Sequence, residues 1–206
     1  MALLFVGDGP RDEAAVPRLV EGILEIEVRE TFRPWARLHG GGSGYGRKLA
    51  FALGQARDLN AQGLVATIDR DHDHSGGRLG AVRKRRDDVR TVSPPFPTAL
   101  GEASPHLEAW LLDDEVAVRT ALRLDPDRVV PNVRNEKHPK SALEALHAAS
   151  RRAGDRPLEV WADLARAVRP ERCAHAQSTG FEEFVAEISL ELGPLAGGTR
   201  RREPRP

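Results

Sequence analysis

The chain has 206 residues, which is enough for one domain, or for one domain with a modest helical appendage. Its 31 basic and 31 acidic residues give zero formal net charge, so only a local concentration of charge can argue for nucleic-acid binding. The single cysteine, Cys173, excludes an internal disulfide and a four-cysteine zinc site. The apolar runs are too short for a bilayer span or a signal peptide, so we expect a cytoplasmic protein with no membrane association.

Short apolar runs alternate with longer amphipathic segments over the first hundred residues, a pattern typical of a parallel sheet covered by helices. Strands are predicted at 3–6, 31–38, 64–68 and 90–92. A first helix is expected after Asp12, which would serve as its N-cap. Further helices are expected at 47–60, 76–89, 105–113, 140–152, 158–168 and 181–192. The predicted fold class is therefore α/β, a parallel sheet flanked by helices, with a helical C-terminal extension.

Three segments follow from this pattern. Residues 1–120 are expected to form the α/β core, and residues 121–198 a helical extension packed on it. Residues 199–206, basic and containing proline, are expected to be a disordered tail.

Acidic residues follow two of the predicted strands. Asp8 comes just after the first, and Asp69, Asp71 and Asp73 come just after the third. Ligands of an open parallel sheet lie beyond the carboxyl ends of its strands, so these residues should meet at one edge. Carboxylates held together repel one another unless a cation neutralises them, and Mg²⁺ or Mn²⁺ suits an all-oxygen ligand set and serves phosphoryl chemistry. An aspartate after a strand is also a common turn or cap residue, and for Asp8 that interpretation stays open.

Two stretches carry a resemblance to a known family. The sequences GDGPRDE (7–13) and IDRDHD (68–73) resemble the Toprim domain, the metal-binding module of primases, topoisomerases, small repair nucleases and overcoming-lysogenization-defect nucleases. The chain looks most like a bacterial family of small stand-alone Toprim-like proteins of unknown function. Residues that extend the resemblance are the glycine-rich loop 40–46, the stretch Glu108–Asp114 and the pair Pro139-Lys140. The resemblance covers about residues 3–145 and implies a Toprim-like fold.

The resemblance implies a metal-dependent nuclease in which Asp8 or Glu13, with Asp69 and Asp71, holds Mg²⁺ or Mn²⁺ and activates water. The chain departs from the Toprim pattern at Asp8, where the family normally has glutamate. Aspartate is one methylene shorter, which puts catalytic competence more in question than the fold. Glu13, at the second acidic position of the motif, is expected to compensate.

Other charged residues have a functional and a structural interpretation. Glu108 is expected to face the same edge and act in catalysis, or only to offset a helix dipole. Lys140 is expected to stabilise charge on a phosphate, or to be an ordinary surface lysine. Residues predicted to contact nucleic-acid phosphates are Arg47, Lys48, Arg83, Lys84, Arg85 and Arg86. A solvated charged helix explains the last four equally well.

Three functional hypotheses result. The first is a nuclease acting on DNA or RNA, with DNA favoured. The resemblance implies the frequent company of an ABC- or AAA-type ATPase, often in phage defence, and this sequence has no P-loop of its own. The second is a non-catalytic Toprim-like module that binds nucleic acid or a protein partner. The third is a phosphatase with Asp69 as nucleophile, although haloacid-dehalogenase-type enzymes carry that motif on the first strand. The sequence is also compatible with an oligomer.

Overall fold

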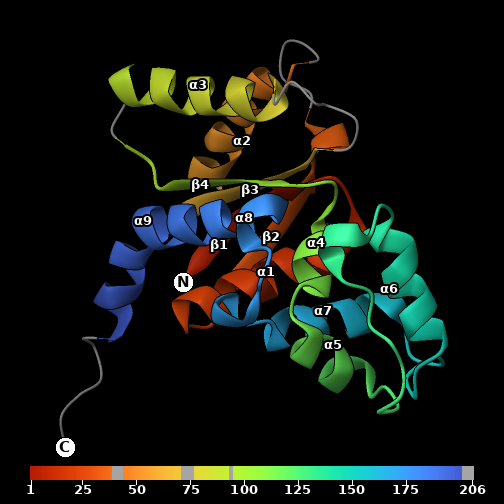
Figure 1. Cartoon of the computed structure of the whole chain (residues 1–206). Coiled ribbons are helices and arrows are strands. Elements are labelled where there is room, and N and C mark those ends of the chain that lie inside the picture. Colours follow the sequence, from red (N-terminus) through yellow and green to blue (C-terminus); the bar gives the residue numbers. More distant parts are fainter. Residues whose placement is uncertain (39–43, 71–76, 93–94, 201–206) are drawn as a thin grey trace, which may run out of the picture.

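The computed structural model describes residues 1–38, 44–70, 77–92 and 95–200. Its centre is a four-stranded, all-parallel sheet in the order β2-β1-β3-β4 (Figure 1). The strands are β1 (Ala2–Gly7), β2 (Arg29–Pro34), β3 (Gly63–Asp69) and β4 (Thr98–Ala103). The predicted α/β class, a parallel sheet flanked by helices with a C-terminal helix, is confirmed.

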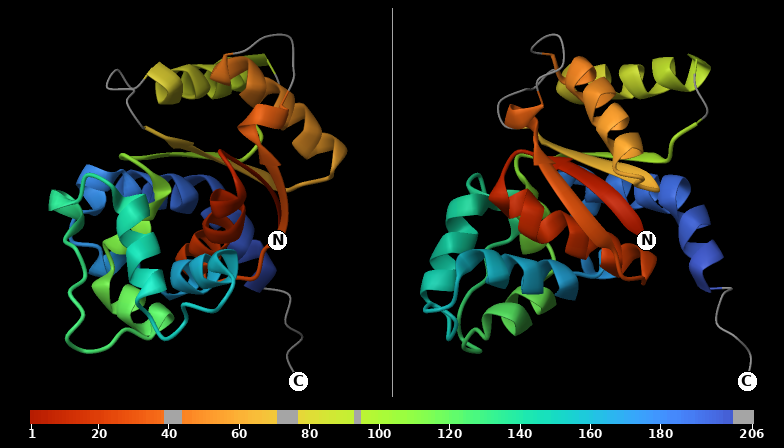
Figure 2. Two further views of the ribbon diagram at one scale, coloured as in Figure 1. Left: turned by 90° about the vertical axis from the view of Figure 1, so that its right-hand side faces the viewer. Right: turned by 180° about the vertical axis from the view of Figure 1, so that it is seen from behind.

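Helices cover both faces of this sheet (Figure 2). On one face lie α2 (Tyr45–Asp58) and α3 (Gly77–Val92). The other helices are α1 (Pro10–Leu24), α4 (Leu107–Leu112), α5 (Glu115–Leu122), α6 (Pro139–Ala148), α7 (Pro157–Ala167), α8 (Ala176–Thr179) and α9 (Phe181–Arg200). Short 3₁₀ turns occupy Trp35–Arg37, Val133–Asn135 and Pro170–Arg172. Within the described ranges, no helix has the combination of length and apolar character that a bilayer crossing requires.

The two-residue alternation of the strands divides the core into two clusters. In β1, Leu3 and Phe5 belong to the cluster shared with α1, whereas Leu4 and Val6 belong to the cluster shared with α2 and α3. Side chains alternate across a strand, so every buried strand of this sheet must be apolar on both faces. This explains why the inner strands β1 and β3 appear in the sequence as continuous apolar runs rather than as alternating ones.

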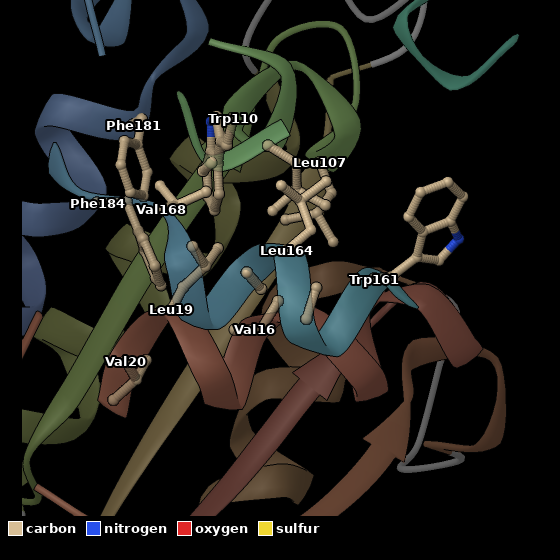
Figure 3. Packing of buried hydrophobic residues seen from close by; sticks show 14 of the residues in the cluster. Val16, Leu19, Val20, Leu107, Trp110, Trp161, Leu164, Val168, Phe181 and Phe184 are labelled. Atoms are coloured by element: carbon tan, nitrogen blue, oxygen red, sulfur yellow. The ribbon is translucent and has the colours of Figure 1, made fainter. Parts of the chain in front are cut away.

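The larger cluster joins the first and last parts of the chain. Val16 and Leu19 of α1 pack near Leu164 of α7, and Trp110 of α4 stacks on Phe184 of α9 with ring centroids 4.8 Å apart (Figure 3). Residues on both sides of the expected boundary at 120/121 therefore share one core. The last helix also includes the first two residues of the expected tail, and residues 201–206 lie outside the described ranges.

Three predicted elements are wrong in position. The strand expected at 31–38 is β2, which ends at Pro34 and is followed by a 3₁₀ turn. The segment 90–92, expected to be a strand, is the end of α3, and the fourth strand is β4. β4 contains small residues because α9 lies close against it: a Cβ at Gly101 would meet Phe184 Cδ2 at 2.5 Å. The first helix begins at Pro10 rather than after Asp12, since a proline at the first helical position needs no hydrogen-bond acceptor for its nitrogen.

Ion pairs between α3 and α9 close the outer edge of β4. We call the three pairs the edge ladder: Arg83–Glu183, Arg86–Glu187 and Arg90–Glu191. Glu187 and Glu191 also accept hydrogen bonds from the Leu100 and Thr98 N–H groups, each at 3.3 Å. An edge strand with unsatisfied N–H groups invites pairing with another chain, and these carboxylates satisfy two of them.

Candidate functional site

A small pocket lies beyond the carboxyl ends of β1 and β3, where the sequence predicts the functional edge. Its volume is about 250 Å³. The charged and titratable residues that line it are Asp8, Arg11, Asp12, Asp69, His106, Glu108 and Lys140. They come from β1, α1, β3, α4 and α6, so segments separated by more than a hundred residues contribute to one site.

Asp8 and Asp69 meet because their strands are neighbours in register. Val6 pairs with Ala66, which brings the residues that follow β1 beside the end of β3. The Asp69 N–H donates a hydrogen bond of 3.2 Å to Asp8 Oδ2. The prediction that these two residues meet at one edge of the sheet is confirmed.

Asp12 is a buried acidic residue of the site, with an exposed fraction of 5 %. Its Oδ1 accepts a hydrogen bond from Thr67 Oγ1 at 3.1 Å, and its Oδ2 accepts one from the Gly9 N–H at 3.2 Å. Gly7 provides the room for this carboxylate, since a Cβ there would lie 2.6 Å from Asp12 Cβ. Gly9 is the N-cap of α1, and the bond from its N–H to Asp12 is the capping-box interaction of the third helical residue, so Asp12 caps the helix from inside it and not as the expected N-cap.

Burial and mutual repulsion make the acids of the pocket hard to ionise together. Burial, then the charges of Asp12, Asp8 and Glu108, raise the pKa of Asp69 to about 8. Burial, then the charge of Asp8, raise the pKa of Asp12 to about 6, although hydrogen bonds from Thr67 and Gly9 favour its ionised form. In the absence of a cation, burial and repulsion therefore favour the protonated forms of Asp69 and Asp12.

Glu108, predicted to be catalytic, lies in the pocket but is ion-paired with Arg11. The guanidinium of Arg11 reaches both Glu108 on α4 and the more exposed Glu144 on α6. With an exposed fraction of 5 %, Glu108 is neutralised by this arginine, and the pair links α1 to α4 and α6. The structural interpretation, in which Glu108 only offsets a helix dipole, is incomplete, because its carboxylate lies in the pocket and pairs with Arg11.

Two further groups line the same pocket. His106 Nδ1 lies 3.4 Å from Asp69 Oδ2, while the Leu107 N–H donates to Asp69 Oδ1 at 3.0 Å, so the start of α4 holds both oxygens of Asp69. Lys140, at the start of α6, is exposed, and within the described part of the chain no carboxylate lies at ion-pair distance from it. Its exposed ammonium group brings a positive charge to the pocket.

The remaining predicted acids are placed differently. Glu13 is exposed on α1 and does not line the pocket; its neighbour Asp12 does. Asp71 and Asp73 lie outside the described residues. The sequence predicts Asp12 to be a helix cap and does not single out His106. The signal for Asp12 was its position between the predicted strand and helix together with Gly7, whose missing side chain makes space for it.

The predicted phosphate-binding residues fall into two groups. Arg83 and Arg86 belong to the edge ladder, whereas Lys84 and Arg85 are exposed on α3. On α2, Arg47 is exposed, and Lys48 Nζ lies 5.7 Å from the centroid of the Tyr45 ring. The expected basic stretch is therefore divided between structural and solvent-facing positions.

The donor set fits a hard divalent cation by its chemistry. Asp8, Asp12 and Asp69 supply carboxylate oxygens only, and their mutual repulsion is the feature that a bound cation would relieve. Among the described residues, no three acidic, histidine or cysteine side chains stand ready-arranged around one ion position. The described carboxylates thus offer part of a ligand set, next to Asp71 and Asp73 in the sequence.

Comparisons with protein-family models, with curated proteins and with solved structures find no match for this chain. The chemistry of the pocket and the resemblance in its motifs are therefore the grounds for a functional proposal.

Proposed function

We propose that the chain is a Mg²⁺- or Mn²⁺-dependent phosphodiesterase of the Toprim type that cleaves nucleic acid. One observation carries the proposal: Asp8, Asp12 and Asp69 share a single pocket in which burial and repulsion raise the pKa values of Asp12 and Asp69. Ionising these crowded acids together costs free energy, and a divalent cation offsets that cost.

The residues of the pocket would take four roles. The aspartates would hold the cation, and Mg²⁺ or Mn²⁺ bound there supplies positive charge to a phosphate and lowers the pKa of water. His106 and the Leu107 N–H orient Asp69 through its two oxygens. Lys140 lies where it can bind a non-bridging phosphate oxygen. Arg11 holds Glu108 and, through Glu144, the helix that carries Lys140.

The test is hydrolysis of bis(p-nitrophenyl) phosphate, and of DNA and RNA, by the purified full chain with Mn²⁺, with Mg²⁺ and with EDTA. We expect EDTA-sensitive cleavage that falls about 100-fold or more in Asp69→Asn. Asp58→Asn, which alters an exposed aspartate at the end of α2, is the matched control and should leave the rate unchanged. Equal rates in the two variants, or no metal-dependent cleavage of any of these substrates, would contradict the proposal.

An ATPase partner of the ABC or AAA type belongs to the same proposal, with the chain as the nuclease subunit in phage defence. The experiment is repeated with the full chain coexpressed with an ATPase encoded beside it. A rate of DNA cleavage that depends on both the ATPase and Asp69 supports this arrangement. Cleavage that is indifferent to the ATPase and to ATP removes the partner from the proposal.

One observation favours a second candidate, a non-catalytic nucleic-acid- or partner-binding module. Arg11 already neutralises Glu108, and Asp8 is shorter than the glutamate usual at that position in the Toprim pattern. Calorimetry separates the two. Binding of Mn²⁺ that is lost in Asp69→Asn supports the enzyme, whereas no detectable binding of Mn²⁺ or Mg²⁺ supports the module.

A further inference from the structure

The layer formed by α2 and α3 is the basic side of a protein that is neutral as a whole. These two helices contain nine arginine and lysine residues against three aspartates, although the chain has 31 residues of each sign. The remainder of the chain is correspondingly acidic. Both helices lie on the same face of the sheet, as all three views show (Figures 1 and 2).

The acids of this layer lie away from the pocket. Asp58 is the last residue of α2, and Asp87 and Asp88 fall in the second half of α3. The first halves of both helices, which begin at the end of the sheet where the pocket lies, contain basic residues and no acidic ones. Positive charge is thus concentrated beside the site rather than spread over the layer.

Three of the arginines of this layer are already paired in the edge ladder and are not available to a ligand. Arg83, Arg86 and Arg90 face glutamates of α9, and Arg86 is only 12 % exposed in its side chain. Lys48, Lys84 and Arg85 differ: in the described part of the chain none of them has a carboxylate at ion-pair distance. A polyanion can bind these three without breaking an internal pair.

Close packing brings the available cations of the two helices together. A Cβ at Gly46 of α2 would lie 2.9 Å from the Ala81 carbonyl oxygen and 3.4 Å from Arg85 Cβ, so α3 passes directly over the start of α2. Arg78 connects this area to the pocket, because its Nη1 donates to the Asp69 carbonyl oxygen at 3.2 Å and its guanidinium lies 5.6 Å from the Tyr45 ring centroid.

We propose that Lys48, Lys84 and Arg85 form a docking surface for the phosphate backbone of duplex DNA, next to the pocket. This inference names the nucleic acid on which the proposed nuclease would act, and so it rests on the proposed function. Its test measures DNA binding and does not depend on that function. Single-stranded binders stack successive bases on aromatic rings. The aromatic rings of α2 and α3 are only Tyr45 and Phe51, and Tyr45 already contacts Trp35, Lys48 and Arg78. Contact with phosphates therefore dominates, and a duplex has the higher charge density.

The experiment measures binding of a short labelled duplex DNA to the full chain by fluorescence anisotropy in EDTA, over a series of salt concentrations. We expect Lys84→Glu/Arg85→Glu to bind about tenfold more weakly or worse, and to lower the slope of log K against log salt by roughly 2. The matched control is Arg123→Glu/Arg128→Glu, which makes the same change at two exposed residues after α5 and should alter affinity less than about threefold. Lys48→Glu is a second, independent test and should also weaken binding.

Thermal unfolding of each variant confirms that the fold is retained. Three outcomes overturn the docking surface: no binding by the unaltered chain, equal weakening in the two double variants, or tighter binding of a single strand of the same length. Hydrolysis of bis(p-nitrophenyl) phosphate, too small to reach α3, should be the same in Lys84→Glu/Arg85→Glu as in the unaltered chain. If no protein hydrolyses it but the binding contrast is found, the proposed function fails and the docking surface stands.

Discussion

Carboxylates have different surroundings in two regions of the molecule, the edge ladder and the pocket. In the edge ladder each glutamate of α9 faces an arginine of α3. In the pocket, Asp8, Asp12 and Asp69 lie together, burial and repulsion raise the pKa values of Asp12 and Asp69, and Arg11 pairs with Glu108. A chain with equal numbers of acidic and basic residues can pair its acids with arginines and does so at the ladder. The crowded acids with raised pKa values therefore mark the place where a group from outside the chain is expected.

Asp114 extends this comparison to the interior. It is fully buried, and it accepts hydrogen bonds from the Ala117 and Arg169 N–H groups and pairs with Arg172 at 3.0 Å. Asp114→Asn is expected to lower the free energy of unfolding by about 3 kcal/mol, because charge-assisted hydrogen bonds are lost from a buried group. Urea denaturation at neutral pH checks this. An unchanged midpoint would show that pairing does not stabilise this acid.

The same substitution at Asp69 should have the opposite sign. The pKa of Asp69 is about 8 in the folded chain and near 3.8 when unfolded, so the folded state binds the extra proton between those values. Stability must then fall as pH rises from about 4 through 8. In EDTA at pH 9, Asp69→Asn is expected to raise the free energy of unfolding by about 2 kcal/mol, with little effect at pH 4. Denaturation at both pH values tests it, and a destabilised variant at pH 9 would contradict the account.

Breaking the Arg86–Glu187 pair of the edge ladder has the next largest expected effect on stability. Arg86 pairs with Glu187 at 2.6 Å and both side chains are less than one fifth exposed. Arg86→Met leaves Glu187 poorly solvated and without its partner, so a loss of about 1.5 kcal/mol is expected, reduced at high salt. Thermal melts at low and high salt measure it. The double variant Arg86→Met/Glu187→Leu should recover most of the loss.

The Arg83–Glu183 pair of the edge ladder should contribute least to stability. In the Arg83–Glu183 pair the glutamate is more than half exposed, and water screens such pairs strongly. Arg83→Met is therefore expected to cost less than about 0.5 kcal/mol. A loss as large as that for Arg86→Met would show that burial does not set the strength of the ladder.

Much of the fold could be predicted from the sequence. The buried strands β1 and β3 are continuous apolar runs, and helical spacing located α1, α7 and α9. β4 was misplaced because it lacks a continuous apolar run: Gly101 leaves room for Phe184 and Trp110, and such contacts are not visible in a local pattern. The segment 90–92 was expected to be a strand, but it continues α3, and Arg90 pairs with Glu191 of α9.

The site was only partly predictable. Topology rules were enough to place Asp8 beside Asp69, because parallel strands end at the same edge. They could not tell Asp12 from Glu13, since a single residue step on a helix turns the side chain by about 100°. Nor could they show that Arg83 and Arg86 face Glu183 and Glu187, which lie a hundred residues later in the sequence.

Titration calorimetry of Mn²⁺ into the full chain at neutral pH tests the central claim most directly, with Asp69→Asn and Asp58→Asn measured in parallel. The account predicts that the unaltered chain and Asp58→Asn bind Mn²⁺ with release of protons, because the cation displaces the proton that raised pKa values hold on the pocket acids. Asp69→Asn should bind at least about tenfold more weakly. Equal affinity in all three proteins, or no binding in any, would contradict the claim that the pocket's carboxylates form a cation site.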